Sequence, residues 1–252
     1  MPTYLETILE GQRMLEADLS SLRQLRDKLQ TALSGNWTTG DPRFYYAGSY
    51  AKHTMIRSSF DLDLVIYFPP TGRFSVKEIY ELVEKRLNNR GYRTQRHNVA
   101  IRLPYQGGFH LDVVPGRAID NTYQFANLYS PERDSTKRTS IKVHIDAVRS
   151  GGSQDVIKLV KLWRLRHQVG LGSFVIELAV ARSLAGRERQ ALEDKVWEVL
   201  RFFQDEFRTA NLIDPANSNN VVSDDVSTGV KQSVASAAAT SRSKRSWQEI
   251  VW

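Results

Sequence analysis

The stretch AGSYAKHTMIRSSFDLDLVIYF, which runs from Ala47 to Phe68, combines a Gly-Ser pair with two aspartates in an apolar run. Asp61 and Asp63 are separated by one leucine and followed by another, an alternation typical of a β-strand. Side chains two positions apart on a strand point to the same face, so both carboxylates project together. Two like charges held this close repel each other, and a divalent cation between them removes the repulsion. The stretch therefore predicts a strand whose acidic face requires a cation.

A third acidic residue lies in a similar apolar setting further along the chain. Residues 98–105, a QGG turn and residues 109–116 predict a β-hairpin, in which Asp112 stands between Leu111 and Val113. If this hairpin pairs beside the first acidic strand, the three carboxylates converge and can hold two hard divalent cations, Mg²⁺ above all. Taken alone, Asp112 is equally well explained as an exposed strand carboxylate.

Composition narrows the class of protein. The 252 residues include no cysteine, which excludes disulfides and thiolate metal sites and fits a cytoplasmic protein. No segment has the length of a membrane-spanning helix, and the N-terminus lacks the pattern of a secretory signal. The net charge of +7 favours a polyanionic partner: nucleotides, nucleic acid or an acidic membrane surface.

Hydrophobic periodicity predicts an α+β protein in two parts. Leucines at helical spacing predict one long helix over residues 3–34, and residues 36–117 mix strands with helices. After about residue 140 the pattern is helical. We therefore expect one domain at residues 1–138 and a helical one at 139–252. The small, polar segment at 230–245 is either a weakly packed helix or a flexible tail.

The order of these segments resembles the nucleotidyltransferase superfamily typified by DNA polymerase β. Within it, the chain is similar to the bacterial cGAS/DncV-like nucleotidyltransferases (CD-NTases) and the oligoadenylate synthetases. The resemblance implies a polymerase β-like core with a mixed sheet, flanking helices and a long N-terminal spine helix, followed by a helical lobe. The positions that match the G-S-Y-x-x-x-T-x-I…D-x-D-L signature are Gly48, Ser49, Tyr50, Thr54, Ile56, Asp61, Asp63 and Leu64.

Three motifs of the second half also resemble the family. They are IKLVKLWR with Lys161, GSFVIELAV with Ser173, and LIDPANSNNVV with Asp214 and Asn220. The resemblance implies that Lys161 and Ser173 contact a triphosphate, together with Gly48 and Ser49, and that the Asp214 loop belongs to the substrate site. Without the resemblance, Lys161 is expected on the solvated face of a helix.

The resemblance also implies roles for the carboxylates. Asp61 and Asp63 would hold two Mg²⁺ ions, for which Mn²⁺ can substitute, and Asp112 would help to hold the ion that activates the attacking hydroxyl. The five histidines show no ligand spacing and are assigned to no metal. The basic residues Arg102, Arg117 and Lys52 are expected only as lining of a nucleotide groove.

The function implied is metal-dependent joining of nucleoside triphosphates, with release of pyrophosphate, into a cyclic di- or trinucleotide signal in bacterial anti-phage defence (CBASS-like). Such a signal acts on a downstream effector protein. The chain ends in EIVW, without the C-terminal glycine that some relatives use for conjugation, so no conjugation partner is expected. Because no segment has the length of a membrane-spanning helix, no membrane partner is expected either.

Two alternatives remain open at this point. The same site could make linear RNA or DNA oligonucleotides without a template, from NTPs or dNTPs, as Hailong-type defence polymerases do, with the hydroxyl-rich segment 233–246 as a protein primer. The chain could also be an inactive nucleic-acid-binding module. The intact carboxylate set argues against the module, since acidic groups repel phosphate unless a metal is present.

Overall fold

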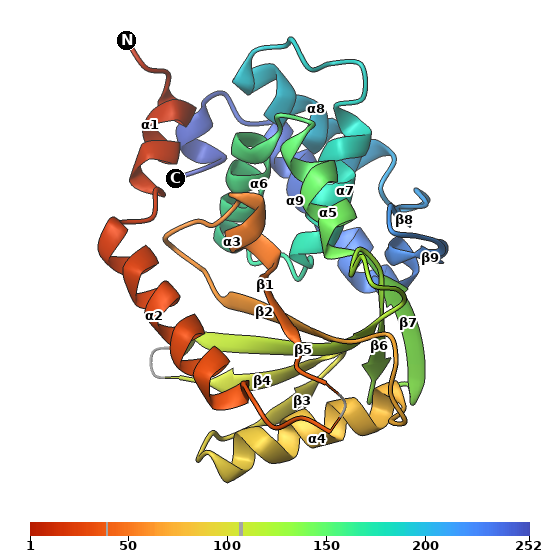
Figure 1. Ribbon diagram of the computed structural model, residues 1–252. Coiled ribbons are helices and arrows are strands. Elements are labelled where there is room, and N and C mark those ends of the chain that lie inside the picture. The colour runs from red at the N-terminus through yellow and green to blue at the C-terminus, as the bar shows by residue number, and fades with distance from the viewer. Residues whose placement is uncertain (39, 106–107) are drawn as a thin grey trace. The chain divides into compact units, whose positions relative to one another are not determined.

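The computed structural model describes residues 1–38, 40–105 and 108–252, and it contains two compact units (Figure 1). The sheet unit comprises Met14–Lys52 and Phe60–Ile145. The helical unit comprises Met1–Arg13, His53–Ser59 and Asp146–Trp252. The chain passes between the units more than once, and its last crossing falls shortly after the boundary predicted at residue 138.

The sheet unit is built on a seven-stranded mixed sheet in which β2 and β5 run parallel and the other neighbouring strands run antiparallel. The order is β1-β2-β5-β4-β3, and β6 joins β5 to β7. The strands are β1 (Arg43–Tyr46), β2 (Leu62–Phe68), β3 (Gln95–His97), β4 (Ala100–Pro104), β5 (His110–Ala118), β6 (Ala126–Ser130) and β7 (Ser135–Thr139).

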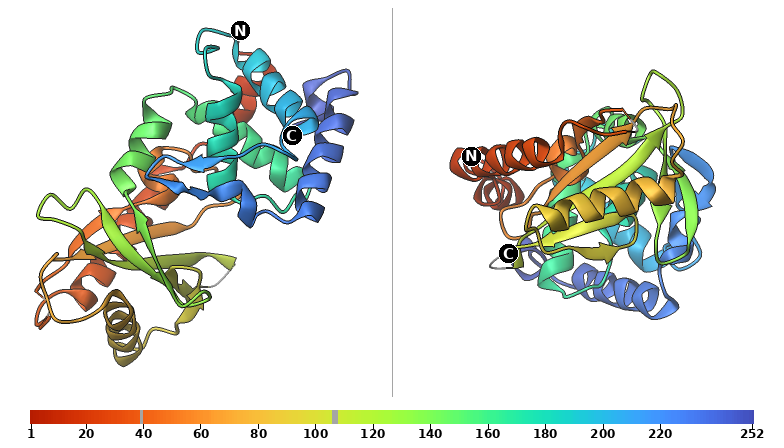
Figure 2. Two further views of the ribbon diagram at one scale, coloured as in Figure 1. Left: turned by 90° about the vertical axis from the view of Figure 1, so that its right-hand side faces the viewer. Right: turned by 60° about the horizontal axis from the view of Figure 1, so that its bottom comes forward.

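Helix α4 (Val76–Asn89) lies across one face of this sheet, as the right-hand view of Figure 2 shows. It begins with a capping box formed by Ser75 and Glu78, and it buries a stripe that includes Tyr80 and Val83. The Tyr80 hydroxyl donates to the Ala100 carbonyl at 2.9 Å, which ties α4 to β4. Helix α2 (Glu16–Leu33) contacts α4 in turn, and the short helix α3 (Gly48–Lys52) follows β1.

The predicted strand around the acidic pair and the predicted hairpin are both confirmed. Strand β2 is almost wholly buried, and β4 and β5 pair antiparallel as expected. The Tyr105 amide donates to the Phe109 carbonyl at 2.9 Å and closes the connection between them. Of the predicted QGG turn, residues 106 and 107 lie outside the described residues.

The single helix predicted over residues 3–34 is wrong, because the chain forms two helices there. Helix α1 (Tyr4–Gly11) belongs to the helical unit and α2 to the sheet unit. At the break, the Gln12 carbonyl accepts from the Arg57 amide and its side-chain oxygen from the Ser58 amide, both at 3.0 Å. These bonds to a distant loop replace the helical continuation.

The helical unit packs its helices around a continuous apolar core. Helix α5 (Ile141–Arg149) leads into this unit. The further elements of the unit are α6 (Gln154–Arg166), α7 (Ser173–Ser183), α8 (Leu192–Asp205), β8 (Ile213–Asp214), β9 (Asn217–Val221), η2 (Val222–Asp225), α9 (Thr228–Arg242) and η3 (Trp247–Glu249). Trp163 stacks on Phe203 with ring centroids 5.7 Å apart, and its indole N–H donates to Ser241 at 2.9 Å. The segment at 230–245 is therefore a packed helix over most of its length.

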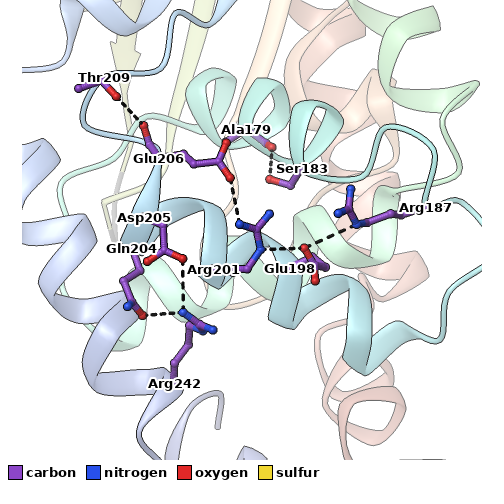
Figure 3. A network of polar contacts seen from close by, with 10 residues as sticks. All are labelled: Ala179, Ser183, Arg187, Glu198, Arg201, Gln204, Asp205, Glu206, Thr209 and Arg242. Atoms are coloured by element: carbon purple, nitrogen blue, oxygen red, sulfur yellow. Dashed lines mark hydrogen bonds and ion pairs between the residues drawn. The ribbon is translucent and has the colours of Figure 1, made fainter.

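Ion pairs on α8 and its surroundings add a polar layer to this unit (Figure 3). Arg201 donates to Glu198 and Glu206, each at 3.0 Å, and Arg242 donates to Gln204 at 2.8 Å. Because these groups are partly exposed, we expect a contribution of at most about 1 kcal/mol from each pair. In the described part of the chain, none of the helices combines the length and apolar character needed to span a bilayer.

Candidate active site

Two of the predicted carboxylates stand side by side on the parallel strands. The register of β2 and β5 places Asp63 directly beside Asp112, and paired residues of neighbouring strands project to the same face. The predicted convergence of the carboxylates depended on the hairpin pairing beside the first acidic strand, and the structure contains this pairing. Asp61 directly precedes β2 and is half-buried. It lies two positions before Asp63, and side chains at this spacing on an extended backbone project to the same face.

The Gly-Ser turn packs against this acidic row. The Ala47 amide donates to the backbone carbonyl of Asp63 at 3.0 Å, which holds the start of α3 against β2. Gly48 has φ +52°, and a β-carbon on it would overlap the Asp63 carboxylate. Only glycine meets both conditions. Ser49 is the next residue of α3 and is half-buried.

Asp112 has a strong partner within the sheet. Arg102 lies opposite it in the β4–β5 register, and the guanidinium donates from Nε to Oδ1 at 2.9 Å and from Nη2 to Oδ2 at 2.8 Å. The Asp112 side chain is 10% exposed and that of Arg102 is 27% exposed. The hydrogen bonds from Arg102 to Asp112, opposed in part by burial, raise the pKa of Arg102.

His110 lies between the carboxylates. Its Nε2 atom is 3.4 Å from Oδ2 of Asp61 and 3.8 Å from Oδ2 of Asp112. This nitrogen is buried and makes no hydrogen bond of good geometry with any described group. The histidine thus faces the same acidic row as the predicted site residues.

The donor chemistry of this row fits a hard divalent cation. Carboxylate oxygens are the ligands that Mg²⁺ and Mn²⁺ prefer, and the turn at Gly48 leaves the Asp63 carboxylate uncovered by any side chain of residue 48. Among the described residues, however, no group of three or more acidic or histidine side chains is already arranged to hold an ion. In the structure, the bidentate contact with Arg102 turns both Asp112 oxygens toward a cation of the protein itself.

The predicted phosphate-binding lysine has a different environment in the helical unit. Lys161 is 3% exposed, and its ammonium donates to the Thr54 carbonyl at 3.1 Å and to the Thr54 hydroxyl at 3.2 Å. Thr54 belongs to the G-S-Y signature and Lys161 to the IKLVKLWR motif, both of which resemble the family. The contact fixes the loop at residues 53–59 against α6.

The remaining predicted substrate residues also lie in the helical unit. The Ser173 hydroxyl, at the start of α7, accepts from Arg164 at 3.3 Å. Asp214 is 2% exposed and accepts from the Ala216 amide at 2.9 Å and from the Asn220 side chain at 3.0 Å. Asp214 and Asn220 therefore close the β8–β9 hairpin on itself.

Sequence reasoning overlooked two groups of the acidic row. It assigned His110 to no metal and expected Arg102 only as lining of a nucleotide groove. Residues 110 and 112 are two positions apart on a predicted strand, and this spacing alone places both side chains on one face. The partner of Arg102 depends on the length of the hairpin turn, which the sequence does not fix.

The mixed sheet, the carboxylates on neighbouring strands and the Gly-Ser turn that packs against them define a polymerase β-like nucleotidyltransferase core. Residues 42–115 match the family model described as the nucleotidyltransferase domain of cyclic GMP-AMP synthase DncV-like proteins. This segment contains the turn and all three carboxylates. Over this segment the chain resembles the cGAS/DncV-like nucleotidyltransferases.

Two relatives are similar to the chain in sequence, and a solved structure has the same fold. A c-di-GMP synthase from Roseivirga ehrenbergii is 35% identical over 130 residues, which is 44% of this chain and 35% of the relative. The CBASS oligonucleotide cyclase CdnC of Escherichia coli is 31% identical over 183 residues, or 63% of this chain and 57% of the relative. The alignments thus cover less than two thirds of either relative. The structure of the Bradyrhizobium diazoefficiens CD-NTase CdnG in complex with GTP has the same fold, with a TM-score of 0.77, 13% identity, and 98% and 95% of the two chains covered.

Proposed function

We propose that the chain is a nucleotidyltransferase that joins nucleoside triphosphates into a cyclic di- or trinucleotide signal, with release of pyrophosphate, in anti-phage defence of the CBASS type. The observation that carries this proposal is the placement of Asp63 beside Asp112, with Asp61 at the same end of β2 and the Gly48 turn packed against them. Both sequence relatives, a c-di-GMP synthase and an oligonucleotide cyclase, make cyclic products by name, which supports a cyclic product here.

The carboxylates are the residues that would hold the metal. The family is generally dependent on divalent metal, and we propose Mg²⁺, with Mn²⁺ as a substitute. Asp61 and Asp63 would contact both ions and Asp112 one of them. When bound, the ions would supply neutralisation of phosphate charge and a more acidic attacking hydroxyl.

The contribution of the chain itself is position and charge. Gly48 keeps the space beside the Asp63 carboxylate free of a side chain, and Ser49, the next residue, would offer its hydroxyl to a phosphate oxygen. Holding the two reacting nucleotides in line lowers the entropic part of the barrier, so little covalent chemistry is required of the side chains.

The residues of the helical unit support two different roles. Ser173 is half-buried at the start of a helix, which suits contact with a phosphate. Lys161 is buried on Thr54, so we propose that it acts mainly by fixing the loop at 53–59. Asp214 and Asn220 would shape the substrate site through the hairpin that they close.

The packing of α9 bears on the linear alternative. Ser241, which lies in the hydroxyl-rich segment, is fully buried and accepts from Trp163. A residue in this position is a poor acceptor for protein-primed synthesis. We propose a cytoplasmic enzyme whose product acts on a separate effector protein.

The first test is pyrophosphate release by the purified chain. The protein receives all four NTPs or all four dNTPs, with Mg²⁺, with Mn²⁺ or with EDTA. We expect metal-dependent release from NTPs that is lost in the Asp61→Asn/Asp63→Asn double variant. Binding of RNA or DNA that persists in EDTA, without release under any condition, would instead favour a binding module.

A further inference from the structure

We infer that Arg102 is a built-in counter-cation of the site: it holds Asp112 when no metal is present, and Asp112 becomes a metal ligand only by exchange from Arg102. Arg102 would then set the affinity of the enzyme for divalent metal. This inference rests on the proposed function, because it assumes that the acidic row binds metal.

The contact between the two residues is bidentate. Both carboxylate oxygens of Asp112 accept from Arg102, at 2.9 and 2.8 Å, in the fork-to-fork geometry that makes such pairs strong and directional. The β4–β5 register places the two residues opposite each other, so the backbone itself brings the guanidinium to the carboxylate. An ion that takes Asp112 as a ligand must therefore compete with this contact.

The contact with Arg102 offsets the repulsion among the neighbouring carboxylates. Asp61, Asp63 and Asp112 share one face, and like charges at this separation raise the free energy of the metal-free protein. Asp112 is also the most buried of the three, and an unpaired charge at a buried position is strongly destabilising. Arg102 neutralises this carboxylate in the metal-free state, as a metal would in the loaded state.

Arg102 should therefore act in opposite directions on the two states. It stabilises the metal-free protein, and it weakens metal binding, because its charge repels the ion and its bonds to Asp112 must be broken. A purely structural ion pair would stabilise the metal-free protein without changing metal affinity.

The test compares Arg102→Gln with Arg96→Gln in the 252-residue chain. Arg96, on the neighbouring strand β3, makes a similar bidentate pair with Glu84 of helix α4, with contacts of 3.1 Å to Oε1 and 2.6 Å to Oε2. The register places Arg96 on the opposite face of the sheet from Arg102 and the acidic row. Binding of Mn²⁺ alone, without nucleotide, is measured from the electron paramagnetic resonance signal of the free ion. The melting temperature is recorded with and without Mn²⁺.

We expect Arg102→Gln to bind Mn²⁺ more tightly, on the order of tenfold, as removal of one nearby like charge predicts. We also expect it to melt at a lower temperature than the wild type without metal and to gain more on addition of Mn²⁺. Arg96→Gln should bind Mn²⁺ as the wild type does. In the Asp112→Asn background, Arg102→Gln should no longer change the Mn²⁺ affinity.

Two results would overturn the inference, and they can be told apart. If Mn²⁺ binding depends on Asp61 and Asp63 but is unchanged or weaker in Arg102→Gln, Arg102 is no competitor and the proposed function stands. If neither the wild type nor the variant binds Mn²⁺, the metal-dependent function fails together with the inference.

Discussion

Gly48 and Asp63 lie so close together that a β-carbon on residue 48 would occupy the position of the Asp63 carboxylate. The two residues belong to different elements, the start of α3 and the strand β2, and the Ala47 amide bonds to the Asp63 carbonyl next to them. The Gly-Ser turn and the acidic strand therefore form one local structure, in which the absence of a side chain at position 48 is a requirement.

Substitution Gly48→Ala should abolish most of the activity. The new methyl group must displace the Asp63 carboxylate or the turn, and alanine is also strained at φ +52°. A displacement of about 1 Å at reacting groups commonly costs about a hundredfold in rate, which we expect in kcat for pyrophosphate release. Gly229→Ala is the control, because a β-carbon at Gly229 meets open space. Near-wild-type activity of Gly48→Ala would contradict the coupling of turn and carboxylate.

The buried lysine gives a prediction about stability. Lys161→Met leaves the Thr54 carbonyl and hydroxyl without their buried donor, so the free energy of unfolding should fall by about 2 kcal/mol. The control is Lys158→Met on the same helix, whose side chain is 27% exposed and pairs with Asp155. This variant should stay within about 0.5 kcal/mol of the wild type. Urea denaturation measures both, and equal stability of the two variants would show that Lys161 does not support the loop.

The packing of α9 can be tested with two serines of the same helix. Ser241→Ala removes the acceptor of the buried Trp163 N–H and should cost about 1–2 kcal/mol in the free energy of unfolding. Ser236→Ala, at an exposed position, should change little. Indistinguishable denaturation curves for the two variants would argue that the segment is loosely attached.

A pH-dependent contribution is expected from His53. Its Nε2 lies 2.8 Å from Nη2 of Arg149, which can only donate, so this nitrogen is the unprotonated acceptor. Burial and then the charges of Arg149 and Lys158 lower the pKa of His53 from 6.5. The unfolded chain therefore takes up the proton at higher pH than the folded chain. Stability from this residue is present above pH 6.5 and declines as the pH falls toward the lower folded pKa.

Nuclear magnetic resonance titration of the histidine side chains measures this effect. Arg149→Gln should raise the pKa of His53 toward its ordinary value, because a neighbouring positive charge is removed. His97, which belongs to the sheet unit, serves as an internal reference in the same spectra. An unchanged pKa of His53 in the variant would mean that burial and Lys158 set the shift without Arg149.

The parts of the fold that depend on local pattern were predictable. Alternation and the flanking prolines define β2, and the Gly-containing segment between two alternating runs defines the β4–β5 hairpin. The break between α1 and α2 was not predictable, because its cause is the hydrogen bonding of Gln12 to a loop more than forty residues away.

The candidate site also has parts that the sequence predicted and parts that it could not predict. The acidic row follows from strand parity once β2 and β5 are known to pair, and the sequence suggested that pairing only as a condition. The contact of Arg102 with Asp112 depends on the register across the hairpin, and the burial of Lys161 depends on where α6 packs. Both contacts arise from tertiary structure and cannot be predicted from the spacing of side chains along the sequence.

The most direct measurement for the proposed function is mass spectrometry of the reaction product. The purified chain is incubated with NTPs and Mg²⁺ or Mn²⁺, treated with phosphatase, and compared with the Asp61→Asn/Asp63→Asn variant. We predict a phosphatase-resistant product of two or three nucleotides that is absent from the variant. A ladder of phosphatase-sensitive oligomers, or a product that the variant also makes, would contradict a cyclic synthase that works through these carboxylates.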